Sequence, residues 1–95
     1  MSWLKNEHMY LAEVPVGDSY TPTKTVSVEL PPGASSVRYA VLTQVINTEA
    51  GGTPWPDTFV TRVIRQVSDS IQISISRTDG VAWTMNISMM ILVAW

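Results

Sequence analysis

Apolar and polar residues alternate at every second position through most of this chain, and no stretch repeats with the period of a helix. In the segment KTVSVEL, residues 24–30, the apolar side chains of Val26, Val28 and Leu30 fall on one face and the polar ones on the other. The Pro-Pro-Gly sequence at residues 31–33 ends this run. The pattern predicts a β-strand with one face in a core.

The same alternation predicts further strands over residues 36–47, 57–67, 71–77 and 81–95. MYLAEV, at residues 9–14, is a candidate for one more. The last strand is apolar on both faces from Met89 onward, which is typical of a strand that is covered on both sides. Asp79-Gly80 suits a hairpin turn, because these residues tolerate positive φ. Short strands at short spacing predict an all-β fold, a single six-stranded antiparallel β-sandwich.

The first 23 residues break the pattern. Pro15, Gly17 and Pro22 predict a loop or an N-terminal arm over residues 1–23, so that the sandwich itself would occupy residues 24–95. We expect the arm to dock on a neighbouring protein. Trp3 would be either an anchor in a partner's pocket or a frayed terminal residue.

Composition narrows the classes of function. The 95 residues fit one domain, and only 15% of them are charged, against about 25% in ordinary soluble domains, so we expect another subunit to cover part of the surface. The net charge is −2 and the six basic residues are scattered, which argues against nucleic acid and against anionic membrane surfaces. The apolar end, residues 89–95, is too short to span a bilayer, so we expect no membrane insertion. No apolar segment marks a signal peptide, which predicts a protein made in the cytoplasm.

Candidate chemistry is sparse. The chain has no cysteine, which excludes disulfides and thiolate chemistry, and its one histidine, His8, lies in the predicted arm. Hydrolytic triads and zinc sites both need more ligating or nucleophilic residues than that. We therefore expect no enzyme, no metal site and no cofactor.

The loop sequence AGGTPWPDTF, residues 50–59, sets Trp55 between Pro54 and Pro56. Neither proline can donate to a sheet ladder, and both bias the preceding residue toward an extended backbone, so the tryptophan is held in a semi-rigid loop. Its ring would be either a platform for a ligand or partner, or a plug over the edge of the sandwich.

The order of these segments resembles the H-type lectin domain. The stretches that carry the resemblance are residues 41–45, 61–67, 71–77 and 83–91, within a region that spans residues 24–95. The resemblance implies a six-stranded antiparallel sandwich that forms a homotrimer and binds sugars such as N-acetylgalactosamine between subunits.

Within that resemblance, Arg62 matches the position of a sugar-binding arginine. The family's histidine is replaced here by the sequence RTDG, residues 77–80, and the tryptophan of its last strand by Met89 or Met90. In a sugar site, Trp55 would accompany Arg62, and a polar residue such as Asp57 or Asp79 would complete the site. Arg62 and Arg65 stand three apart on one strand, so simple alternation predicts that they point to opposite faces, in salt bridges or in a ligand site.

Two functions from different classes follow. The first is a virion structural or interaction protein, a capsid decoration or fibre component, in which a trimeric sandwich contacts other virion proteins through its arm. The second is a carbohydrate-binding lectin module for host-surface glycans, with Trp55 stacking on a sugar and Arg62 bonding a hydroxyl.

Overall fold

The computed structural model describes residues 3–31, 40–47, 59–66 and 69–94, and all its regular structure is β. The described strands are β1 (Leu4–Asn6), β2 (Met9–Ser19), β3 (Thr23–Glu29), β4 (Ala40–Asn47), β5 (Phe59–Gln66), β6 (Ser70–Arg77) and β7 (Trp83–Ala94). The prediction of an all-β antiparallel fold is confirmed. Among these residues there is no helix long and apolar enough to cross a membrane.

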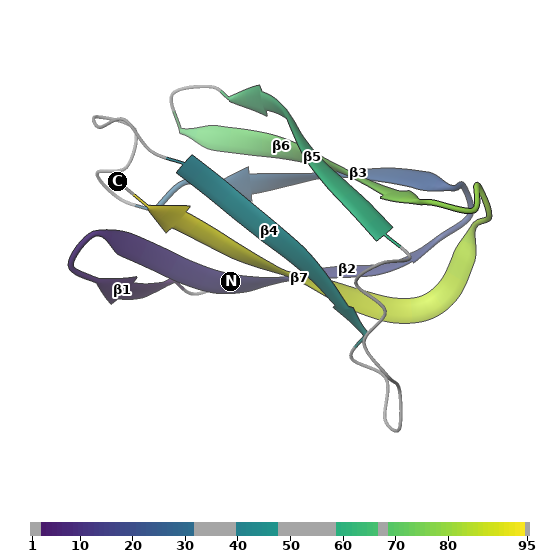
Figure 1. Ribbon diagram of the computed structural model, residues 1–95, viewed down its shortest axis with the longest axis horizontal. Helices are drawn as coiled ribbons and strands as arrows, with labels where there is room; N and C mark the ends of the chain where they lie inside the picture. The colour runs from purple at the N-terminus through teal and green to yellow at the C-terminus, as the bar shows by residue number, and fades with distance from the viewer. Residues whose placement is uncertain (1–2, 32–39, 48–58, 67–68, 95) are drawn as a thin grey trace.

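The strands form two antiparallel sheets (Figure 1). The four-stranded sheet has the order β1-β2-β7-β4, and the three-stranded sheet has the order β3-β6-β5. The chain changes sheet four times, between β2 and β3, β3 and β4, β4 and β5, and β6 and β7. Each sheet therefore has one face toward the other sheet and one outer face.

The core lies between the two central strands, β6 and β7. Their inward side chains are almost fully buried: Ile71, Ile73 and Ile75 from β6, and Ile87, Met89, Ile91 and Val93 from β7. Alternate residues of β2 complete the layer. Burying a side chain of this size contributes about 1.5–3 kcal/mol, so this interior dominates the stability of the fold.

The structure extends the sandwich into the segment that the sequence assigned to an arm. β2 runs through Pro15 and Gly17 and pairs with β7 along its length, so the prediction of a loop over these residues is wrong. Proline is tolerated here because β1 pairs only with residues 9–11, so that no described strand pairs with the other edge of β2 at Pro15. The ladder shifts register around Gly17, whose φ of 77° is a conformation that glycine adopts readily.

Side chains satisfy the backbone where β2 bulges. Lys24 Nζ donates to the carbonyl oxygens of Val16, at 2.6 Å, and Asp18, at 2.9 Å. Trp83 Nε1 donates to the carbonyl oxygen of Gly17 at 2.9 Å. Three successive carbonyls that leave the regular ladder thus keep a partner, as buried backbone groups require.

The turn at residues 78–80 is confirmed as a turn, with Gly80 at a φ of 73°. It is not a hairpin, because β6 and β7 belong to different sheets. Residues 78–82 instead carry the chain from one layer of the sandwich to the other. The turn chemistry was readable from the sequence, whereas the partner of each strand was not.

Candidate functional site: the two outer faces

A row of four leucines crosses the outer face of the four-stranded sheet, one from each strand. Leu4 of β1 lies opposite Leu11 of β2, and Leu11 lies opposite Leu92 of β7. Leu92 in turn lies opposite Leu42 of β4. Opposite residues of an antiparallel pair share a face, with Cβ atoms about 4.5–5.5 Å apart. The four side chains therefore form one continuous ridge, which we call the leucine row.

The leucine row points away from the core. Leu92 lies between Ile91 and Val93, both of which are fully buried inside the sandwich, and successive side chains of a strand alternate between faces. The two ends of the row are the most accessible: Leu4 is 72% exposed and Leu42 is 64% exposed. Leu11 and Leu92 in the middle are half-buried. No described residue of the chain covers the row.

The rows on either side of the leucines differ in size. On one side, Ala94 lies opposite both Ala40 and Met9, and the two alanines leave the surface low on β4 and β7. On the other side, Met90 lies opposite both Gln44 and Glu13. We call the outer face made by these rows and the leucine row the leucine face. Glu13 is the one charged residue in these described rows.

A hollow of about 180 Å³ opens on the leucine face. Its lining residues are Leu11, Leu42, Thr43, Gln44, Met90 and Leu92. An engineered cavity of about 150 Å³ in another protein is large enough to hold benzene, so this hollow has room for one large apolar side chain. The leucine face thus combines a ridge, a low step and a hollow, and most of the residues that form them are apolar.

The outer face of the three-stranded sheet has the opposite character, and we call it the polar face. β3 and β6 cover it with small polar side chains, namely Thr23, Thr25, Ser27, Ser70, Gln72, Ser74 and Ser76, beside Glu29. The hydroxyls of Thr23 and Ser76 are 3.0 Å apart across the two strands. This face presents mainly hydrogen-bonding groups to solvent, with the exposed Val60 of β5 at its edge.

Both arginines of β5 belong to the polar face, so the prediction that they point to opposite faces is wrong. Arg62 lies opposite Ser74 and Arg65 lies opposite Gln72, two outward residues of the same strand. The register shifts between Val63 and Arg65, which places three residues of β5 against two of β6. Both side chains are exposed. The bulge therefore puts two positive charges side by side at one edge of the polar face.

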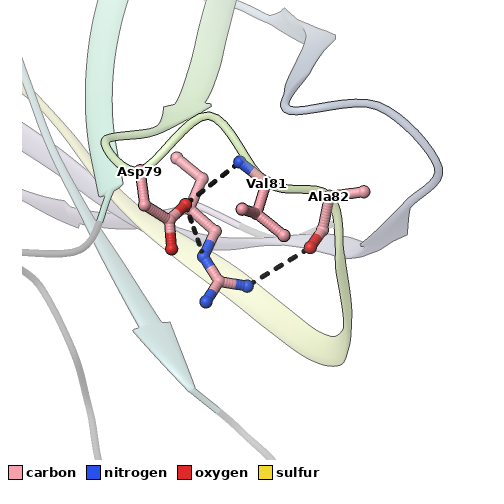
Figure 2. Close-up of polar contacts among 4 residues, drawn as sticks. Asp79, Val81 and Ala82 are labelled. Carbon is pink, nitrogen blue, oxygen red and sulfur yellow. Dashed lines mark hydrogen bonds and ion pairs between the residues drawn. The ribbon is translucent and has the colours of Figure 1, made fainter.

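Asp79, a predicted ligand-binding residue, holds the turn between the sheets (Figure 2). Its Oδ1 lies 3.0 Å from Arg77 Nε and accepts a hydrogen bond from the backbone N–H of Val81 at 3.1 Å. Arg77 Nη1 donates to the carbonyl oxygen of Ala82 at 3.3 Å. Asp79 and Arg62 are not joined by any interaction that the described residues show. The carboxylate of Asp79 therefore stabilises the turn between β6 and β7.

Trp3 packs on its own chain. Its ring meets the ring of Tyr10 edge-on, with the centroids 6.3 Å apart, and it is half-buried against the core. It also lines a groove of about 420 Å³ with residues of β2 and of residues 27–30. The ring thereby closes part of the open side between β2 and β3. Its role as an anchor in a partner stays a prediction.

Trp55 and Asp57 lie outside the described residues, so both alternatives for Trp55, a platform for a ligand or a plug over the sandwich edge, stay predictions. Among the residues that the structure describes, no group of three or more histidine, cysteine, aspartate or glutamate side chains could hold a metal ion. The leucine row was missed from the sequence, because its members are far apart in the chain and only the strand register brings them together. The apolar outer positions of residues 89–94 were the one signal that pointed to it.

Comparisons with known proteins leave the family open. No model of a known protein family matches the chain. Neither the curated proteins nor the solved structures contain a significant match to it. The two outer faces are therefore the features of the molecule from which its function is inferred.

Proposed function

We propose that this protein is a structural or interaction protein, a homo-oligomeric subunit that is built into a larger assembly through its leucine face. The observation that carries the proposal is the leucine row, Leu4, Leu11, Leu92 and Leu42, on a face with a single charge. Monomeric proteins rarely expose contiguous apolar patches beyond a few hundred Å², and larger patches mark interaction sites. The setting that we favour is a virion, as a capsid decoration or fibre component.

The N-terminal segment takes part in this surface. Leu4, Met9 and Leu11 come from residues 1–23, so the segment that the sequence marked for docking supplies the β1 and β2 side of the leucine face. This supports a docking role for the segment, although as part of the sheet rather than as a separate arm. The threefold state and the virion setting come from the lectin-like order of the sequence segments and are part of the proposal.

The test is the native mass of the purified protein, measured over a range of concentrations for the wild type and two variants. We expect an oligomer that Leu42→Lys weakens, because the charge would be placed inside the apolar contact. Val60→Lys is the matched control, since Val60 is 55% exposed on the polar face. A wild type that is monomeric throughout, or an oligomer that Leu42→Lys leaves unchanged, contradicts the proposal.

A carbohydrate-binding module is the second candidate, and the observation that favours it is the polar face. Arg62 and Arg65 lie together beside Ser74 and Gln72, and arginine with short hydroxyl and amide groups suits a carboxylated or sulfated sugar. Here we expect binding to a sulfated polysaccharide that weakens with salt and is lost in the Arg62→Ala, Arg65→Ala double variant. Titration calorimetry checks this, and equal binding by wild type and double variant would contradict it.

A further inference from the structure

We infer that the partner of the leucine face is a second copy of the same chain, packed face to face about a two-fold axis that runs along the strands between β2 and β7. This inference rests on the proposed function and adds the identity and the geometry of the contact. Such an axis places β1 of each copy over β4 of the other. The same surface patch then serves both copies, as in every two-fold interface.

The shape of the face favours this pairing. The hollow lies beside Leu42 and Leu92, on the β4 side of the sheet, whereas the most exposed leucine, Leu4, projects from β1 at the opposite edge. The two-fold axis brings Leu4 of each copy over the hollow of the other. Each copy thus supplies one protruding side chain and one recess, and both contacts form at once.

Charge and polarity favour a copy of the chain over a charged partner. The described rows of the leucine face contain one charged side chain, Glu13, which is exposed and lies on β2 in a row apart from the leucines, so that the leucine contact itself is uncharged. Aligned sheets pack about 10 Å apart with their strands within about 30° of each other, which brings the two leucine rows into apolar contact. An acidic or basic partner would find almost nothing on this face with which to pair.

The size of the face is enough for a reversible dimer. Strands about 4.8 Å apart and rows about 6.8 Å apart give the three described rows a footprint of roughly 400 Å². Two copies would cover about 800 Å², which is at the low end of weak, transient interfaces. We therefore expect a dimer that dissociates on dilution. A threefold assembly remains compatible, because two trimers joined through these faces make a hexamer with both kinds of axis.

The absence of native cysteine makes the geometry directly testable. Leu4→Cys and Leu42→Cys are prepared as separate full-length variants, mixed, and treated with a bismaleimide whose span matches the ~10 Å between packed sheets. We expect linked dimers in the mixture and few in Leu42→Cys alone, because the axis keeps the two Leu42 positions three strands apart. A mixture of Thr25→Cys and Ser74→Cys, both on the polar face, is the matched control and should stay unlinked.

The outcomes separate the two proposals. The inference is supported by a native mass that corresponds to an even number of chains, together with linkage in the mixture and no linkage in the controls. An oligomer that Leu42→Lys weakens but that gives no Leu4–Leu42 linkage, or a plain trimer, overturns the two-fold contact and leaves the proposed function standing. A monomeric wild type overturns both.

Discussion

The two outer faces of this sandwich are both formed by antiparallel strands, but they differ in the polarity of their outward side chains. On the four-stranded sheet the outward positions carry a row of leucines, and on the three-stranded sheet they carry serines, threonines and two arginines. Both sheets send buried isoleucines inward. The inner faces therefore account for folding, and the contrast between the outer faces is the basis for the proposed contact through the leucine face.

The strongest test of this contrast compares two neighbours on β7. Ile91→Ala removes a fully buried side chain and should lower the free energy of unfolding by about 3 kcal/mol, through lost burial and the cavity left behind. Leu92→Ala, on the outer face, should cost about 1 kcal/mol or less in dilute solution, where the leucine face is open. Urea unfolding at low protein concentration measures both. Equal losses would mean that Leu92 already belongs to a closed core.

Making the polar face apolar should give it the behaviour of the other face. Thr25 and Ser74 lie directly opposite each other, so Thr25→Leu with Ser74→Leu builds a short apolar row there. We expect the double variant to form larger species than the wild type at equal concentration, as measured by sedimentation velocity, since both faces would then be adhesive. Thr25→Ser with Ser74→Thr exchanges the hydroxyls and serves as the control. An unchanged mass would show that apolar character alone does not decide the contact.

The turn that joins the two layers should tolerate change less well than its exposure suggests. Gly80 has a positive φ, and an added Cβ would meet nothing within 4 Å. Gly80→Ala should therefore cost about 1 kcal/mol from backbone strain alone. For a domain of this size that corresponds to a fall in Tm of roughly 4–8 °C, which calorimetry resolves. An unchanged Tm would mean that the turn rearranges freely without disturbing either sheet.

The smallest effect is expected at the ion pair of the same turn. Asp79→Asn keeps an acceptor for the N–H of Val81 but removes the charge that faces Arg77, and both side chains are partly open to solvent. Screened pairs of this kind contribute roughly 0–1 kcal/mol, so the loss should be at the lower end of that range and should shrink at high salt. Denaturant unfolding at low and high salt measures it. A loss that grows with salt would contradict a simple ion pair.

Sequence alternation was sufficient for the described strands from β3 onward and for the class of fold, because the period of two survives wherever one face is buried, whereas β1 was not predicted. It failed at Pro15 and Gly17, where an open edge and a bulge accept residues that usually end strands. It failed again for Arg62 and Arg65, because a bulge changes the parity of every residue that follows it. Local pattern cannot report such shifts, which depend on the opposite strand.

The candidate site was harder to predict than the fold for a related reason. The apolar outer positions near Met90 and Leu92 were visible in the sequence, but their neighbours across the sheet were not. Arg62 and Asp79 were selected as partners in one site, and the structure shows Asp79 engaged in its own turn, with no described interaction to Arg62. A site whose residues come from neighbouring strands depends on the register between those strands. Reasoning from one strand at a time therefore finds only the separate residues.

The leucine row has a consequence for how an assembly of these chains would be controlled. Its members stand at positions 4, 11, 42 and 92, so no short peptide of the sequence contains the motif and an unfolded chain does not display it. The row exists only after the first and last strands of the sheet have found their places. A contact that requires all four leucines would form only with fully folded subunits and would exclude truncated or partly folded chains. Assembly would therefore select for folded protein.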